Sequence, residues 1–172
     1  MSSNTRRIFF AHLLCGTIPP TRCYAFKRLI FRWAGLRIGI NVRIVSSVRI
    51  LATGLVSLGK DTFVGHECLI VGGEASVDIG DNVDIGPRVT LVTGTHIIQP
   101  KGPNVAGKGL SLPIVIEDGC WICTGATILG GSRIGARSLV MAGAVVKGTF
   151  PPESVVGGIP GRIIGNTANS KF

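Results

Sequence analysis

Three histidines, His12, His66 and His96, are the side chains of this sequence best suited to proton transfer. An imidazole has an unperturbed pKa of about 6.5, so it can accept a proton from a hydroxyl group near neutral pH. His96 stands in a stretch rich in glycine and proline, whereas His66 lies between Gly65 and Glu67. Either histidine could act as the general base of a group transfer. The alternative for His96 is a loop histidine that only hydrogen-bonds locally, and the alternative for His66 is a solvated corner residue.

The elements that must position these histidines are indicated by aliphatic side chains that recur every six residues. Aliphatic side chains, which we call the anchors, recur at Ile38, Ile44, Ile50; Leu58, Val64, Ile70; Ile79, Ile85, Leu91; and Ile116, Ile122, Ile128, Ile134, Val140, Val146. A small or compact residue usually stands four positions after an anchor, and glycine often stands directly after the anchor. Neither the helical period of 3.6 nor the strand period of 2.0 produces this pattern. A coil of three short strands with tight corners does, and such coils stack about 4.8 Å apart.

The period is broken most strongly between Leu91 and Ile116. A solenoid must extrude such an excess as a loop, so the sequence predicts an extruded loop at about residues 93–112 that carries His96. Repeat proteins often place their function on insertions of this kind. Two consecutive prolines, Pro151 and Pro152, predict that the chain leaves the coil there, because proline cannot continue a strand ladder.

The segment before the coils is basic and amphipathic. Nine of the 18 Lys and Arg residues lie in the first fifty positions, and the chain carries a net charge of +9. Residues 21–36 predict a helix that caps the open end of the solenoid. A helix lying on a membrane surface is the alternative. The apolar run 8–15 is too short to span a bilayer and lacks a cleavage site. We therefore expect a helical cap at 1–35, a β-helix at 36–165 and a C-terminal tail at 166–172.

Cysteine spacing gives no framework for disulfides or metal. Cys120 and Cys123 have the spacing of half a zinc site, but no second cysteine pair or histidine cluster accompanies them. We expect reduced thiols and no metal.

Residues 36–165 resemble the hexapeptide-repeat acyltransferases, which implies an all-β, left-handed parallel β-helix. The run 79–91 followed by Thr93-Gly94-Thr95-His96 is similar to the maltose and galactoside O-acetyltransferase branch. That resemblance implies that His96, at the foot of the loop, is the catalytic base, although Thr95 is one residue more than the branch has. The imidazole would take the acceptor proton and then protonate the departing CoA thiolate.

The same resemblance implies an acceptor site made by His66, Glu74 and Trp121. Counted back from the run at 79–91, His66 and Glu74 fall where the galactoside branch has an acceptor-site Asn and Asp. Trp121 would form part of the wall of the active-site crevice. A fainter similarity of residues 65–74 to serine acetyltransferases makes His66 the rival base. The alternative for His66 and Glu74 is that both are solvated corner residues without a role in binding.

The co-substrate implied by the resemblance is acetyl-CoA. Thr124, Ala142 and Gly143 match positions along which the family lays the pantetheine arm, and small residues there let the arm approach the coil edge. Lys147 and Arg162 are the cationic candidates for the CoA phosphates. The alternative is that both are surface charges that only make the protein more soluble. Cys123 departs from the glycine usual in the family.

Assembly and acceptor are also expectations from resemblance. The family forms homotrimers with active sites in crevices between subunits. Residues 19–39 look like acetyltransferases that decorate lipopolysaccharide, capsule or exopolysaccharide, so the expected acceptor is a sugar hydroxyl on a glycan, glycolipid or nucleotide sugar. We expect no nucleic-acid partner and a cytoplasmic location, with peripheral membrane contact through the basic N-terminal segment as an option.

Three alternatives remain open at this point. The first is an acyltransferase for serine or an amino sugar. The second is a γ-type carbonic anhydrase on the same helix, which needs three histidines on zinc. The third is a solenoid scaffold without catalysis.

Overall fold

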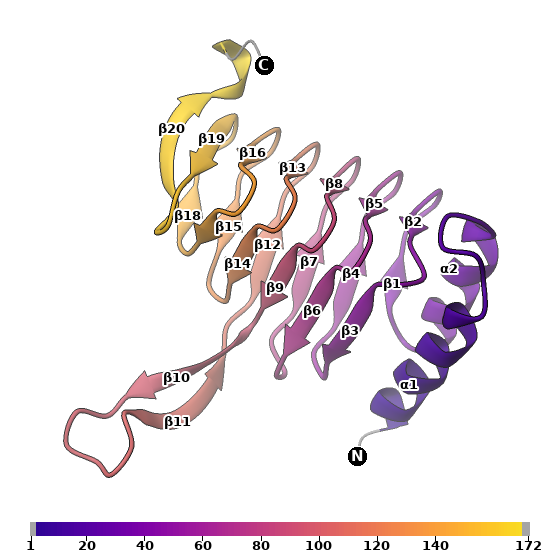
Figure 1. The fold of residues 1–172 in the computed structure, drawn as a ribbon, viewed down its shortest axis with the longest axis horizontal. Coiled ribbons are helices and arrows are strands. Elements are labelled where there is room, and N and C mark those ends of the chain that lie inside the picture. The colour runs from indigo at the N-terminus through magenta and orange to yellow at the C-terminus, as the bar shows by residue number, and fades with distance from the viewer. Residues whose placement is uncertain (1–2, 170–172) are drawn as a thin grey trace.

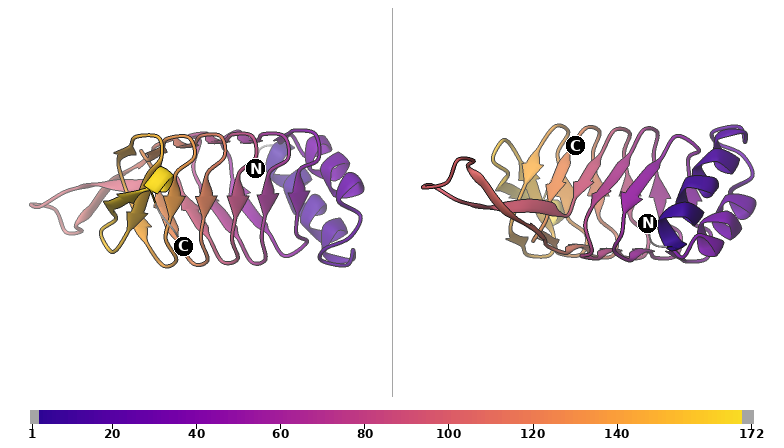
Figure 2. Two further views of the ribbon diagram at one scale, coloured as in Figure 1. Left: turned by 90° about the horizontal axis from the view of Figure 1, so that it is seen from above. Right: turned by 90° about the horizontal axis from the view of Figure 1, so that it is seen from below.

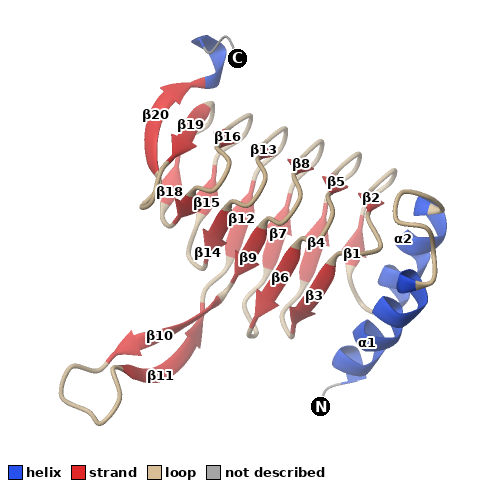
Figure 3. Cartoon of the chain, viewed as in Figure 1, coloured by secondary structure: helices blue, strands red, loops and turns tan. Residues whose placement is uncertain are grey.

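The computed structural model describes residues 3–169. They form a three-sided coil of stacked strands, capped by two helices at the N-terminal end, with one hairpin projecting from its side (Figures 1 and 3). We call the three faces of the coil A, B and C, and on each turn the chain passes them in that order. The stacked coil is the architecture that the six-residue period predicted.

Each face is a sheet of parallel strands from successive turns. Face A holds β1 (Arg37–Ile38), β4 (Val56–Leu58), β7 (Val77–Ile79), β12 (Ile114–Ile116), β15 (Arg133–Ile134) and β18 (Thr149–Phe150). Face B holds β2 (Arg43–Ile44), β5 (Phe63–Val64), β8 (Asp84–Ile85), β13 (Trp121–Ile122), β16 (Leu139–Val140), β19 (Ser154–Gly157) and β20 (Arg162–Asn166). Face C holds β3 (Arg49–Ala52), β6 (Leu69–Gly72), β9 (Thr90–Val92), β14 (Thr127–Leu129) and β17 (Val145–Val146).

The anchors form ladders through the interior. On face A the ladder runs from Leu58 through Ile79 and Ile116 to Ile134, each paired with the next. All the anchors are buried. Most of the small residues four positions later are buried as well, including Thr62, Cys120 and Ala126. A core of stacked identical layers explains why the spacing is strict: one residue more or less would turn an anchor out of the interior.

The interruption after β9 is an antiparallel hairpin. Its strands are β10 (Gly94–Ile98) and β11 (Ala106–Ser111), with His96 opposite Gly109. Figure 2 shows it standing well clear of the coil. The loop expected at about residues 93–112 is thus a hairpin whose two arms are paired strands.

The N-terminal cap closes the exposed edge of the first turn. It consists of α1 (Ser3–Gly16) and α2 (Tyr24–Trp33), which lie side by side across the end of the coil (Figures 1 and 2). The Nε2 atom of His12 lies 3.1 Å from both the amide nitrogen and the carbonyl oxygen of Ile50, on the edge strand β3. Arg28 donates to the carbonyl of Val42 at 3.1 Å. Side chains of the cap thus take up backbone groups that the edge would otherwise leave open.

The sequence located this cap only in part. The helix expected at 21–36 spans Tyr24–Trp33, and the first helix, Ser3–Gly16, was not predicted. Among the described residues, the longest apolar helix is too short to cross a membrane.

The prediction that the chain leaves the coil at Pro151 and Pro152 was wrong. β18 and β19 lie on either side of the two prolines, and both continue the parallel sheets of the preceding turn. The prolines occupy a corner, where the amide of Glu153 donates to the Ala136 carbonyl at 2.8 Å, so no ladder hydrogen bond is lost. After β19 the chain reverses into the antiparallel β20 and a short 3₁₀ helix, Thr167–Asn169. Of the expected tail, 170–172 lie outside the described residues.

Candidate active site

His96 is held in the hairpin by a hydrogen bond across the two strands. Its Nδ1 atom lies 2.9 Å from the carbonyl oxygen of Gly107. A carbonyl can only accept, so Nδ1 is the donor, and in the neutral imidazole the Nε2 lone pair is left to accept another proton. The side chain is exposed to solvent, and its ring lies beside Gly109, whose added Cβ would be 3.7 Å from Cε1. In the neutral imidazole, Nε2 is therefore the unprotonated nitrogen that a base would use.

Glu74 shares a pocket with His96. The pocket has a volume of about 710 Å³ and is lined by residues 73–75, 94–96 and 109–111. Glu74 follows β6, and His96 follows β9 on the next turn, so both lie at the corner between faces C and A, which we call corner C–A. The structure thus brings together two of the residues named from the sequence.

The base of the hairpin is fixed by a chain of hydrogen bonds that the sequence did not reveal. Ser111 donates from Oγ to Oγ1 of Thr93 at 3.0 Å, and the amide of Ala75 donates to Oγ of Ser111 at 3.2 Å. Thr93 is fully buried, and Leu112 donates its amide to the Thr93 carbonyl at 2.9 Å. These hydrogen bonds connect the hairpin to the residue next to Glu74, so they fix the two walls of the pocket relative to each other. Only the position of Thr93 and Ser111 at the two ends of the interruption could have suggested them.

A second group of candidates lies at the other edge of face C, which we call corner B–C. His66, Thr124, Ala142 and Gly143 all stand between a face-B strand and a face-C strand of their turns. Gly143 donates its amide to the Thr124 carbonyl at 3.0 Å, so these corner residues stack on one another. Thr124, Ala142 and Gly143 are exposed, and nothing lies within 4 Å of a Cβ built on Gly143. The stacked residues of corner B–C therefore present an open, narrow backbone edge.

The structure keeps these two groups apart within one chain. His66 precedes β6 and Glu74 follows it, so the whole width of face C separates them. Lys147, between β17 and β18, lies at corner C–A, the hairpin's corner. Arg162 begins β20, directly after Gly161, whose amide donates to the Val145 carbonyl at 2.7 Å. Both cations are exposed.

Trp121 begins β13 on face B, between Cys120 at the corner of faces A and B and Cys123 at corner B–C. Trp121 is 54% exposed on β13. Cys120 is buried, its thiol donates to the Gly135 carbonyl at 3.2 Å, and burial raises its pKa to about 11. Burial also raises the pKa of the half-buried Cys123. These thiols are protonated at neutral pH, whereas a metal binds the thiolate. The described part of the chain contains no cluster of three or more His, Cys, Asp or Glu side chains able to hold a metal.

Comparison with known proteins shows which proteins this chain resembles. Residues 113–148 match the bacterial transferase hexapeptide (six repeats) family. The galactoside O-acetyltransferase of Escherichia coli is 36% identical over 110 residues, which are 63% of this chain and 53% of that protein. The serine acetyltransferase of Bacillus pumilus is 35% identical over 127 residues, 71% of this chain and 53% of that protein. The matched region spans about half the length of these relatives.

The fold agrees over nearly the whole chain. A hexapeptide-repeat acetyltransferase of Vibrio cholerae, solved with acetyl-coenzyme A, superposes with a TM-score of 0.83 at 27% identity and covers 96% of this chain and 87% of that one. The coil is thus a left-handed parallel β-helix of the hexapeptide-repeat class. The chain carries the hexapeptide repeat in residues 113–148 and is similar to hexapeptide-repeat acetyltransferases, among them the galactoside O-acetyltransferase of Escherichia coli.

Proposed function

We propose that this protein transfers acetyl groups from acetyl-CoA to a hydroxyl group, with His96 as the catalytic base. The observation that carries this proposal is the hydrogen bond from Nδ1 of His96 to Gly107, which leaves Nε2 as an acceptor beside an open pocket. Nε2 takes the acceptor proton while the hydroxyl oxygen attacks the thioester carbonyl carbon. The C–S bond breaks, and the imidazolium returns the proton to the CoA sulfur. The products are an acetyl ester and free CoA.

The other candidates receive roles by where they lie. Glu74 shares the pocket of His96, which suits it to hold acceptor hydroxyls or to orient the base. Thr124, Ala142 and Gly143 offer an open backbone edge for the amides of the pantetheine arm. Lys147 and Arg162 would pair with the CoA phosphates. His66 at corner B–C and Trp121 on face B would complete the acceptor site.

These roles require two copies of the chain at each site. The base lies at corner C–A, and the pantetheine edge lies at corner B–C of the same chain, across the width of face C. A homotrimer in which the hairpin of one subunit meets corner B–C of the next would join the two halves. Residues 36–165 would form the transferase domain, and 1–35 would cap it. Light scattering should report three chains per particle.

The proposed acceptor is a sugar hydroxyl of a surface glycan, glycolipid or nucleotide-sugar precursor, acetylated in the cytoplasm. The relation to a galactoside O-acetyltransferase and the resemblance of residues 19–39 to glycan-modifying enzymes support this choice. The second candidate acceptor is serine, because a serine acetyltransferase is matched at nearly the same identity. In that case His66 is the rival base.

The test is an acetyl-transfer assay that measures CoA release with glycan, nucleotide-sugar and serine acceptors. Product with a sugar acceptor that is lost in His96→Ala and kept in His66→Ala supports the proposal. Product with serine alone, or loss in His66→Ala only, assigns the chain to the second candidate. No transfer and no acetyl-CoA binding by calorimetry would identify a scaffold instead.

A further inference from the structure

The first helix of the cap is apolar on both of its faces. Ile8, Ala11, His12 and Cys15 are buried against the coil and α2. The opposite face presents Phe9, Phe10, Leu13 and Leu14, which are 63%, 51%, 59% and 49% exposed. A helix that is apolar all round is ordinarily buried in a protein core or in lipid. Among the described residues, no other segment covers the outer face of α1.

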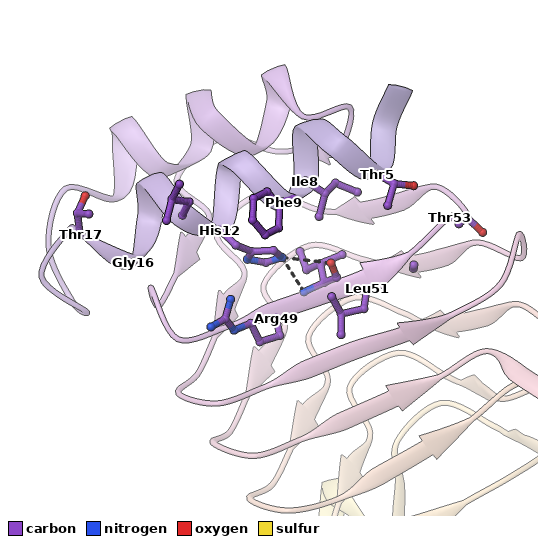
Figure 4. Close-up of a pocket in the computed structure, with 12 residues that line it drawn as sticks. Thr5, Ile8, Phe9, His12, Gly16, Thr17, Arg49, Leu51 and Thr53 are labelled. Atoms are coloured by element: carbon purple, nitrogen blue, oxygen red, sulfur yellow. Dashed lines mark hydrogen bonds between the residues drawn. The ribbon is translucent and has the colours of Figure 1, made fainter. Parts of the chain in front are cut away.

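The second helix and the coil edge extend this surface. Phe26, Leu29 and Trp33 of α2 are 55%, 60% and 53% exposed. The guanidinium carbon of Arg7 lies 6.0 Å from the ring centroid of Trp33, so the outer faces of the two helices adjoin. On the other side of α1, a groove of about 620 Å³ runs between the helix and β3, and Leu51, 59% exposed, lines its far wall (Figure 4). We call these eight exposed apolar side chains, four from α1, three from α2 and Leu51, the cap surface.

The charge around the cap surface has one sign. Residues 1–60 contain ten Lys and Arg and no Asp or Glu: Arg6, Arg7, Arg22, Lys27, Arg28, Arg32, Arg37, Arg43, Arg49 and Lys60. Lys27 and Arg28 serve the fold by donating to backbone carbonyls. Arg6, Arg22, Arg37 and Arg49 have no carboxylate partner among residues 3–169. Arg49 also lines the groove.

We infer that the cap surface docks the protein on an anionic lipid bilayer. Exposed Phe, Leu and Trp side chains flanked by arginines suit the boundary between acyl chains and anionic headgroups. A second copy of the chain is a poor partner, because pairing the cap surfaces would bring two wholly cationic segments together. A nucleic acid matches the charge but offers little to eight apolar side chains. The inference does not rest on acetyl transfer.

The experiment is co-sedimentation of the whole protein with vesicles. One set is phosphatidylcholine alone, and the other contains about 30% phosphatidylglycerol. We expect at least tenfold stronger partition onto the anionic vesicles, weakened by high salt because the arginine contribution is screened. Phe10→Glu/Leu14→Glu should abolish binding. The matched control is Ile98→Glu/Val105→Glu on the hairpin, where the side chains are 73% and 71% exposed and the charge change is the same. It should bind like the parent.

Each other outcome overturns the inference. Equal binding to both vesicle types, no binding, or undiminished binding by Phe10→Glu/Leu14→Glu would do so. Dissociation of the oligomer by that variant would make the cap surface a subunit contact. Should the glutamates unfold the cap, as circular dichroism would reveal, Arg6→Gln/Arg22→Gln replaces them and must weaken anionic binding at least threefold. Acetyl transfer to a soluble acceptor without lipid is measured in parallel, so failure of docking is distinguishable from failure of the proposed function.

Discussion

The Nδ1 atom of His96 lies 2.9 Å from the carbonyl oxygen of Gly107, a bond that joins the two strands of the projecting hairpin. The bond fixes the tautomer of the imidazole and directs Nε2 away from the strand that holds it. The hairpin therefore holds the His96 ring in one orientation and favours one tautomer of its neutral form.

If His96 is the base, removing its imidazole should lower turnover and leave the coil intact. We expect His96→Ala to reduce kcat by about 10²–10⁴, the usual contribution of a general base. The Michaelis constant for acetyl-CoA should change little, because the proposed pantetheine edge lies at another corner. Steady-state kinetics test the prediction. Undiminished kcat with an unchanged melting temperature would disprove the role.

Gly107 should be a positioning residue for this base. A Cβ at Gly107 would lie 2.9 Å from the Ile97 carbonyl oxygen and 3.0 Å from Oε1 of Gln99, so Gly107→Ala must shift the strand that holds His96. We expect kcat to fall about tenfold, with the KM for acetyl-CoA unchanged and the pH–rate profile displaced, since the bond to Nδ1 is disturbed.

Gly109→Ala is the control on the same strand, because its Cβ would meet His96 at an ordinary 3.7 Å. It should keep most of the activity and the parental pH profile. Equal losses in the two variants would mean that Gly107 has no special part.

Separate half-sites predict complementation between two inactive variants. His96→Ala removes the base at corner C–A, and Ala142→Trp blocks the exposed edge at corner B–C. In a co-assembled trimer, random mixing gives about one quarter of the crevices an intact hairpin and an intact edge. We expect activity to return to about that fraction of the parent in refolded or co-expressed mixtures, and mixing without subunit exchange should give none. No recovery in verified mixed trimers would place the whole site in one subunit.

The period of six was sufficient to predict the coil because an anchor shifted by one position would leave the interior. It could not predict α1, since apolar side chains on both faces of Ser3–Gly16 give no amphipathic pattern. Hairpin pairing was hidden by glycines in Ala106–Ser111, which carry little strand preference. For the site, the sequence located His96 at the interruption. It could not show that His66 and Glu74 occupy opposite corners, because that depends on where β6 begins and ends.

Burial of His12 should make the stability of the cap depend on pH. Desolvation is the main cause that lowers the pKa of His12 below 6.5, and the nearby charge of Arg49 lowers it further. Between the lowered pKa and 6.5 the unfolded chain binds more protons than the folded one, so stability is fully present above pH 6.5 and falls with decreasing pH. The slope contributed by one histidine is at most about 1.4 kcal/mol per pH unit.

Urea unfolding of the parent and His12→Gln at pH 7.5 and 5.0 measures this contribution. The glutamine is neutral at both values and can still bond to Ile50. The parent should lose more stability than His12→Gln on acidification, since all other titrating groups are shared. The same loss in both proteins would show that His12 does not titrate in this range.

Close stacking of the turns should make Gly59 intolerant of any side chain. A Cβ at Gly59 would lie 2.3 Å from the carbonyl carbon of Gly80 and 2.5 Å from the amide nitrogen of Asp81 on the next turn. Both are backbone atoms, and the ladder bonds on either side prevent them from yielding separately. We expect Gly59→Ala to lower the free energy of unfolding by about 3 kcal/mol or more. Gly94→Ala, whose Cβ would meet only the Cα of Gly72 at 3.9 Å, should stay within about 1 kcal/mol of the parent. Equal denaturation midpoints for the two variants would contradict this, because the spacing between turns would then have to be elastic enough to admit a methyl group without breaking the anchor ladders.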